Sequence, residues 1–172
     1  MEKEMYLKKR VASIRVEPYL AEYARRKFDV DPKTGGIRIP YTFDLYHCVY
    51  NQMSKPPREA GEVAGANLSI NLPDSRVMPV RKHPEYWNWL SLAAATEIES
   101  CLRNMFNYDF HTVMMTNENL GRPRQQREIV DDFISEYCLT EISSDALLKN
   151  FQRYRMRLSP RKKRKYQKVT RF

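Results

Sequence analysis

Cysteine and glycine are scarce in this chain. Its 172 residues include three cysteines, far apart in the sequence, and five glycines. Three scattered thiols exclude a disulfide framework and predict reduced, buried thiols within helices. The sequence has no glycine-rich phosphate loop. The shortage of glycine also argues against a sheet that interleaves glycine with aromatic residues to read RNA bases.

Long apolar runs are also absent. No segment approaches the roughly 20 apolar residues that span a bilayer. The first ten residues, MEKEMYLKKR, lack the apolar stretch of a secretory signal. Hydrophobic residues make up 42% of the chain, which is typical of an ordered globular protein. We therefore expect a globular protein of the cytoplasm with no membrane partner.

Signatures of catalysis are missing as well. The chain has no HExxH, no GxSxG and no closely spaced pair of metal ligands. Its three histidines, His47, His83 and His111, lie in unrelated sequence contexts, and none of its 11 tyrosines has an organised group of histidines or arginines around it. These absences predict a protein that is not an enzyme, with no catalytic residue, no metal and no cofactor.

Acidic residues are absent from one end of the chain. The formal net charge is +9, and residues 1–120 contribute little to it because they hold 16 basic and 15 acidic residues. Residues 121–172 hold 14 basic and 6 acidic residues, and after Asp145 there are 11 basic residues and no acidic one. This polarity along the chain predicts a polyanionic partner for the C-terminal third.

The order of apolar and polar residues predicts an α+β fold. Alternation predicts three short strands, at residues 11–16, 36–40 and 67–73. Helical spacing after each of the first two strands predicts two helices, and Thr42 is placed to cap the second of them. Ser91 is placed to cap a long third helix. We expect a small three-stranded sheet with helices packed on one face.

A break in the helical pattern predicts how the chain divides. Residues 117–123, NENLGRP, interrupt the pattern and form the predicted boundary. Residues 1–120 would then be an α/β core domain that includes the long helix. Residues 121–159 would be a helical module, and residues 160–172 a basic, flexible tail.

Two stretches of the module have the apolar spacing of helices, residues 124–138 and 143–158, with a short connection between them. Ser143 or Ser144 is placed to cap the second helix. Over residues 123–158 the pair resembles the helix-turn-helix of DNA-binding proteins. The resemblance implies that the second helix enters the major groove while the first crosses the DNA backbone.

The candidate DNA contacts are basic and amide side chains of the module and tail. Arginine can donate two hydrogen bonds to guanine, and glutamine or asparagine can bridge two groups of adenine. The side chains that would face the groove are Lys149, Gln152, Arg153 and Arg157, and Asn150 is a further candidate at the margin. Three arginines near the start of the first helix oppose its dipole and would hold phosphates: Arg122, Arg124 and Arg127. The tail adds Arg161, Lys162, Lys163, Arg164 and Lys165.

The leading hypothesis is a non-enzymatic protein that binds double-stranded DNA and regulates transcription or a mobile element, with a homodimer as one arrangement. In a second hypothesis, residues 10–28 resemble the strand and helix of a ribbon-helix-helix protein, whose paired strands enter the groove, and Arg15 reads bases. A third is an RNA-binding or assembly protein whose basic C-terminus docks on RNA or on an acidic partner. The sequence leaves these alternatives open.

Overall fold

The computed structural model describes residues 10–58, 61, 63–75 and 81–158. Its elements are, in chain order, β1 (Val11–Ile14), α2 (Pro18–Lys27), β2 (Asp29–Val30), β3 (Ile37–Arg38), α3 (Asp44–Gln52), β4 (Leu68–Asn71), α4 (Leu92–Asn119), α5 (Gln126–Tyr137) and α6 (Ser144–Leu158). The expected α+β class is confirmed. Among the described helices, none is long and apolar enough to cross a membrane.

The sheet has four strands in the order β1-β4-β3-β2, so the prediction of three strands is wrong in this detail. β1 pairs with β4 and β2 with β3 in antiparallel fashion, whereas β3 and β4 run parallel. The additional strand is β2, which has only two residues. Alternation cannot reveal so short a strand, because β2 depends on the turn that follows it.

The turn between β2 and β3 is organised by Asp31. Its carboxylate accepts a hydrogen bond from the backbone N–H of Lys33 at 2.9 Å and one from Arg38 at 2.7 Å. Gly35, with φ of 68°, takes the left-handed backbone conformation that glycine adopts without a steric penalty. A side chain at Gly36 would come within 2.7 Å of Asn71 on β4, so this position is restricted to glycine by a close approach.

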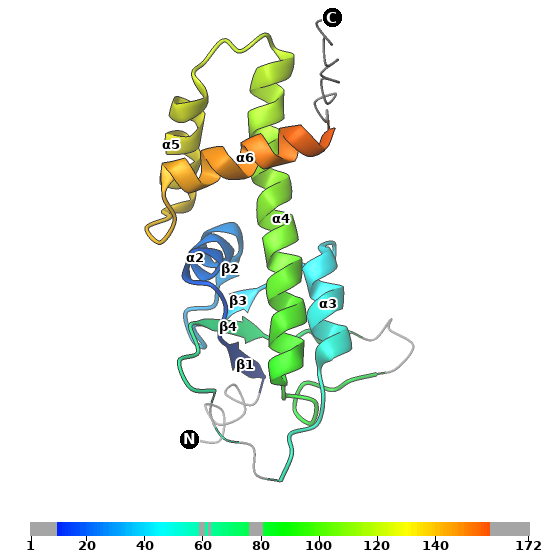
Figure 1. The fold of residues 1–172 in the computed structure, drawn as a ribbon. Helices are drawn as coiled ribbons and strands as arrows, with labels where there is room; N and C mark the ends of the chain where they lie inside the picture. The colour runs from blue at the N-terminus through cyan, green and yellow to red at the C-terminus, as the bar shows by residue number, and fades with distance from the viewer. Residues whose placement is uncertain (1–9, 59–60, 62, 76–80, 159–172) are drawn as a thin grey trace, which may run out of the picture.

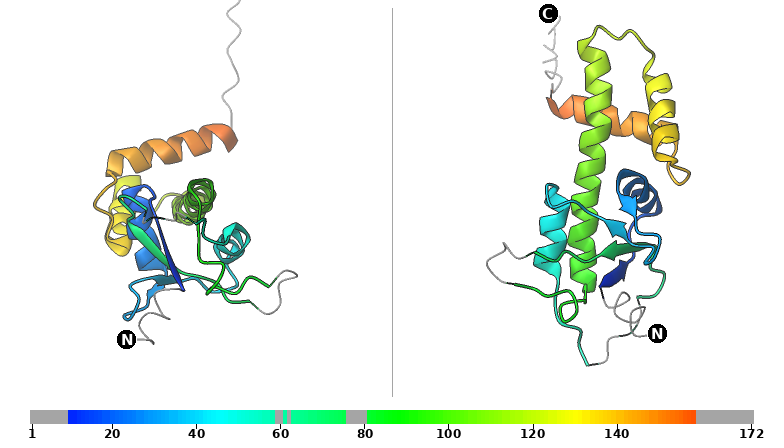
Figure 2. Two further views of the ribbon diagram at one scale, coloured as in Figure 1. Left: turned by 90° about the horizontal axis from the view of Figure 1, so that it is seen from below. Right: turned by 180° about the vertical axis from the view of Figure 1, so that it is seen from behind.

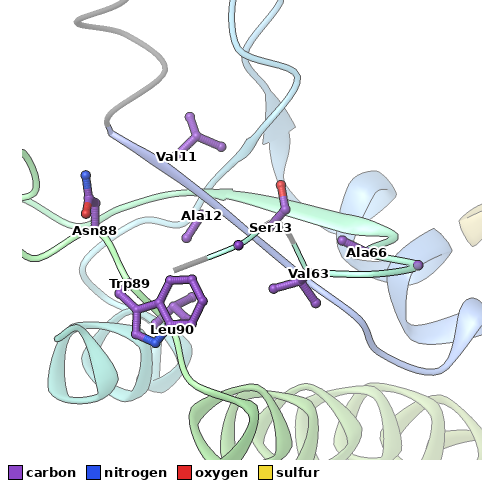
Figure 3. Close-up of a pocket in the computed structure, with 10 residues that line it drawn as sticks. Val11, Ala12, Ser13, Val63, Ala66, Asn88, Trp89 and Leu90 are labelled. Atoms are coloured by element: carbon purple, nitrogen blue, oxygen red, sulfur yellow. The ribbon is translucent and has the colours of Figure 1, made fainter. Parts of the chain in front are cut away.

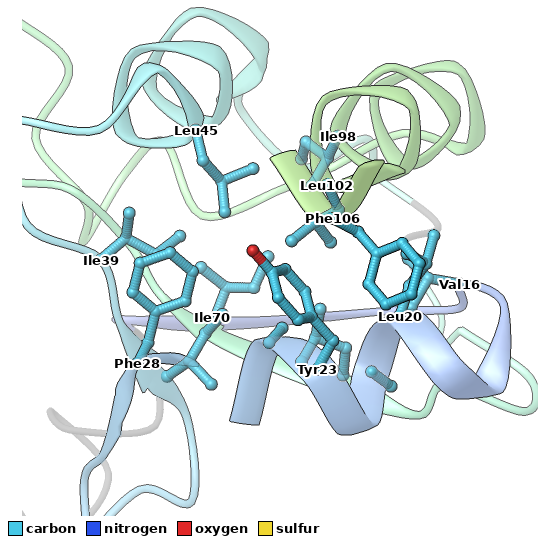
Figure 4. Close-up of a cluster of buried hydrophobic side chains, with 14 of the residues drawn as sticks. Val16, Leu20, Tyr23, Phe28, Ile39, Leu45, Ile70, Ile98, Leu102 and Phe106 are labelled. Atoms are coloured by element: carbon cyan, nitrogen blue, oxygen red, sulfur yellow. The ribbon is translucent and has the colours of Figure 1, made fainter. Parts of the chain in front are cut away.

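One face of the sheet is buried and packs against helices. Along β1 and β4 the buried residues alternate with more exposed ones, as a half-buried sheet requires. Figure 4 shows Ile70 of the sheet among Tyr23 of α2, Leu45 of α3 and Phe106 of α4, all of them buried. The predicted layer of helices on one sheet face agrees with this pattern.

The long helix α4 is shared between the sheet and the C-terminal helices. In Figures 1 and 2, α3 lies beside the half of α4 nearest the sheet, and α5 lies beside the other half, with α6 across both α4 and α5. Phe110 connects α4 with the two C-terminal helices. The centroid of its ring lies 5.2 Å from that of Phe133 on α5 and 6.4 Å from that of Phe151 on α6. The buried side chains form one continuous cluster across both halves. The division at residue 120 stays a prediction.

Two of the three predicted helix caps are observed. The Ser91 side chain accepts from the N–H of Ala94 at 3.1 Å, and that of Ser143 accepts from Ala146 at 3.2 Å, so both expected caps are confirmed. The cap from Thr42 is wrong: Phe43 precedes α3, and no side chain caps it. The expectation of buried thiols is also wrong: Cys48 and Cys101 are only half-buried, and Cys138 is exposed at the end of α5.

Candidate nucleic-acid interface

The helix α6 is held on the molecule by one apolar side. Leu147 and Phe151 are fully buried, and the Tyr154 ring stacks on His111 of α4 with 4.0 Å between ring centroids. Leu158, one turn beyond Tyr154, is 56% exposed. The packed side therefore ends near Tyr154.

Asn150 belongs to the packed side of α6 rather than to the outward side. Its side-chain oxygen lies 2.6 Å from Nε2 of His111, and its side-chain N–H donates to Asn107 at 3.1 Å. Burial lowers the pKa of His111; the hydrogen bond with Asn150 raises it, and nearby Arg157 lowers it. Because both groups of the Asn150 amide are engaged with α4, we leave Asn150 out of the proposed contact surface.

The outward side of α6 presents cations with no acidic partner. Lys149, Arg153 and Arg157 are exposed, and within the described part of the chain none of them forms an ion pair. They recur every fourth residue, so they stay roughly in line and cover about 12 Å of helix. Gln152 and Met156 are exposed beside them. We call these five residues the α6 face.

The arginines near the start of α5 have acidic partners instead. Arg122 pairs with Glu118 at 3.2 Å, and Arg124 pairs with Asp132 at 2.7 Å and with Glu128 at 3.8 Å. Arg127 has a longer contact with Asp145, 3.9 Å. We call Arg122, Arg124 and Arg127 the α5 arginines. Their neighbours supply negative charge, so a bound phosphate is not needed to explain their position.

Glu118 links three parts of the C-terminal region. Its carboxylate accepts from Arg122 and from Gln126 at the start of α5, and it pairs with Arg155 of α6 at 3.3 Å. The side chain is only 14% exposed. Arg155 also lies over the Phe151 ring. Sequence reasoning missed this contact, although Arg155 is the one arginine of α6 that lies outside the predicted outward set.

The connection between α5 and α6 is fastened to α2. Cys138, with φ of 52°, ends α5 in the left-handed conformation. Glu22 of α2 accepts from the N–H groups of Thr140 and Glu141 and from the Thr140 hydroxyl. Burial raises the pKa of Glu22, but these hydrogen bonds outweigh it and lower the pKa overall. The six-residue connection is therefore held in one position, although a helix-turn-helix assignment stays a prediction.

The remaining sequence candidates are placed less directly. Arg161, Lys162, Lys163, Arg164 and Lys165 lie outside the described residues. For the ribbon-helix-helix alternative, β1 pairs with β4 of the same chain, which gives that strand an internal partner on one edge. Arg15 follows it and is exposed.

Two cavities lie away from the α6 face. One, of about 530 Å³, lies beside β1 and is lined by residues such as Ala12, Trp89 and Leu90 (Figure 3); no described residue lining it has an ionisable side chain. The other, of about 580 Å³, lies between α2, α3 and α4 and includes Lys27 and Cys101. No group of three or more potential metal ligands occurs within the described ranges.

Comparison of the chain with protein-family models, with curated proteins and with solved structures finds no match. The arrangement of the described side chains is therefore the basis for assigning a function.

Proposed function

We propose that this protein binds double-stranded DNA through the α6 face and the basic segment that follows it. The observation that carries the proposal is the line of three exposed cations, Lys149, Arg153 and Arg157, without acidic partners in the described structure. Each DNA strand carries one phosphate for about every 3.4 Å of helix axis, so counter-charges are available for cations about 6 Å apart on a helix.

The charge along α6 indicates which end approaches the DNA. Asp145 lies at the start of the helix, and α5 carries exposed Asp131, Asp132 and Glu136 nearby. Phosphates would be repelled there, whereas the C-terminal half of α6 has only basic charges and continues into residues 160–172, with seven basic residues and no acidic one. We infer contact through the C-terminal half, with Gln152 and Arg153 nearest the bases.

This orientation differs from that of a typical helix-turn-helix, in which the start of the second helix contacts base edges. It assigns most of the affinity to phosphates and less to base recognition. In this proposal the protein is a non-enzymatic regulator of transcription or of a mobile element and acts in the cytoplasm. A homodimer would double the contact surface.

The proposal is tested by titrating the full chain with a labelled DNA duplex over a series of salt concentrations. If α6 and the following segment neutralise about eight phosphates, log K falls against log salt with a slope of roughly −7. Removing residues 159–172 should make the slope shallower. Competition by single-stranded and duplex RNA distinguishes DNA from the RNA-binding alternative.

Charge reversal locates the contact. R153E/R157E should lower DNA affinity by about 100-fold at low salt, because two attractive contacts become repulsive. The matched control is R58E/R81E, which makes the same change of net charge at two exposed arginines away from α6. Equal losses in the two variants would contradict a contact at α6, since only net charge would then matter.

A further inference from the structure

The cavity between α2, α3 and α4 gives small molecules access to a thiol. It has a volume of about 580 Å³, and its lining combines apolar and aromatic side chains such as Phe43, Met105 and Tyr108 with polar and charged ones such as Asp44 and Asp109. Cys101 of α4 is one of the lining residues and is half-buried. A reagent the size of a peroxide can therefore enter beside Cys101, while bulk solvent has limited contact with it.

A second thiol lies next to this one on the neighbouring helix. Cys48 of α3 is also half-buried, and its side chain is hydrogen-bonded with that of Cys101. The two helices lie side by side, as the views from front and behind show (Figures 1 and 2). A bond between the two sulfur atoms would thus join adjacent helices and would not require their separation.

The electrostatics of the pair distinguish its two members. The hydrogen bond with Cys48 lowers the pKa of Cys101 to about 7, although burial and the nearby carboxylate of Asp44 act in the opposite direction. The same hydrogen bond, together with burial, raises the pKa of Cys48. The thiolate is the nucleophilic form of a cysteine, and Cys101 is the member of the pair that lines the cavity.

We propose that Cys101 and Cys48 form a redox-active dithiol, which a small hydroperoxide entering the cavity oxidises to a disulfide between α4 and α3. Cys101 is the residue that meets the peroxide, because it lines the cavity. Cys48 is absent from the described lining and is the resolving partner. This site is independent of the proposed DNA contact.

The reaction balances in two steps. With hydrogen peroxide, the Cys101 thiolate attacks one oxygen, so a sulfur–oxygen bond forms, the oxygen–oxygen bond breaks, and the leaving hydroxide takes a proton to become water. Cys48 then attacks the sulfur of the Cys101 sulfenic acid, so the disulfide forms and the sulfur–oxygen bond breaks. The Cys48 proton leaves with the hydroxyl group as a second water. Two electrons pass from the thiols to the peroxide.

The test uses the full-length C138S variant, which removes the exposed third thiol. The reduced protein is treated with hydrogen peroxide, remaining thiols are alkylated, and peptides are identified by mass spectrometry. We expect one cross-linked peptide pair, containing Cys48 and Cys101, and its disappearance after treatment with dithiothreitol. If both thiols stay reduced at peroxide concentrations that oxidise Cys138 in the unmodified protein, the proposal is wrong.

Single variants separate the two roles. In C48S/C138S, dimedone should trap a sulfenic acid on Cys101, whereas C101S/C138S should show much less trapping on Cys48. The pH profile of iodoacetamide alkylation at Cys101 should have its midpoint near 7 with Cys48 present, and it should move to higher pH in C48A/C138S, which lacks the hydrogen bond. Trapping mainly on Cys48, or an unchanged midpoint in C48A/C138S, would overturn the assigned roles.

Discussion

The α6 face and the α5 arginines are two basic regions of one short stretch of sequence, and they differ in what surrounds them. Among the described residues, no acidic side chain pairs with Lys149, Arg153 or Arg157, whereas Arg122 and Arg124 lie within 3.2 Å of carboxylates. A count of charges treats the two regions alike. The comparison shows that the partners of a cation, rather than its number in a sequence, decide whether it is free to meet a phosphate.

The cost of using each region therefore differs. A cation of the α6 face gains a phosphate and loses only water and counterions. Arg124 would first have to leave Asp132, although this pair is half-exposed and contributes little to stability. In the proposed DNA complex the α5 arginines would thus be a weaker second contact, which becomes available when their carboxylates are removed.

The largest expected effect comes from undocking α6 altogether. Phe151→Ala deletes a fully buried ring that packs against Phe110, and it should lower the free energy of unfolding by about 3–5 kcal/mol. DNA affinity should fall with the loss of a fixed α6. The measurement is chemical denaturation followed by DNA titration.

Met156→Ala is the control for that change. Met156 is 58% exposed on the outward side of the same helix, so its removal should change stability by less than about 0.5 kcal/mol. Similar destabilisation by the two variants would show that α6 is not held by the side described here.

A smaller effect is expected from converting paired arginines into unpaired ones. Glu118→Gln leaves Arg122 and Arg155 without their carboxylate, and because the Glu118 side chain is only 14% exposed, we expect a loss of about 1–2 kcal/mol in stability. DNA affinity at low salt should nevertheless rise about threefold to tenfold, since two cations are released beside the α6 face.

The matched control is Glu99→Gln, which removes one of the two carboxylates that pair with Arg103 in the half of α4 near the sheet and leaves Glu17 at 3.1 Å. It makes the same change of net charge, but at a distance from α6, and should raise DNA affinity less. If the two variants bind DNA equally, pairing with Glu118 is not what limits the contribution of Arg122 and Arg155 to DNA affinity.

A third effect concerns the α5–α6 connection, which holds the two regions at a fixed separation. Because hydrogen bonds lower the pKa of Glu22 in the folded protein, its stabilisation is complete above the ordinary glutamate pKa and is lost as pH falls through the lowered one. Glu22→Gln should cost about 1 kcal/mol at pH 7 and nothing once the carboxyl is protonated.

The measurement is the free energy of unfolding of both proteins between pH 7 and pH 3. Glu141→Gln, an exposed neighbour in the connection, is the control and should show a much smaller dependence. A difference between Glu22→Gln and the unmodified protein that does not shrink as pH falls below the ordinary glutamate pKa would contradict an ionised Glu22 as its cause.

Much of the fold could be predicted, because local patterns determine it. The alternation around Ile14 and Ile70 and the helical spacing of α4 to α6 each follow from neighbours in the sequence. The contact between Glu22 and Thr140 joins residues 118 positions apart and has no local signal. The prediction missed strand β2 for a similar reason, because β2 depends on the turn that Asp31 organises.

The sequence predicted which side chains of the candidate site carry positive charge, but not which of them form ion pairs with carboxylates. Spacing placed Lys149 and Arg153 on the outward side, where they are. Asn150 is one residue beyond Lys149, and the turn of about 100° per residue is enough to bring it against His111. Partners such as Glu118 for Arg155 come from another helix, so composition alone could not separate free cations from paired ones.

The smallest expected effect tests the difference between paired and unpaired cations at a single ion pair, Arg124 with Asp132. Asp132→Asn removes the closer partner of Arg124 and leaves the 3.8 Å contact with Glu128. Stability should change by less than about 0.5 kcal/mol, and DNA affinity should rise about twofold. Asp131→Asn removes the same charge from the same helix, but Asp131 contacts the Ser144 hydroxyl and no described arginine. A gain for Asp132→Asn beyond that of Asp131→Asn isolates the release of Arg124, whereas equal gains would mean that the acidic charge of α5 repels DNA and that pairing is irrelevant.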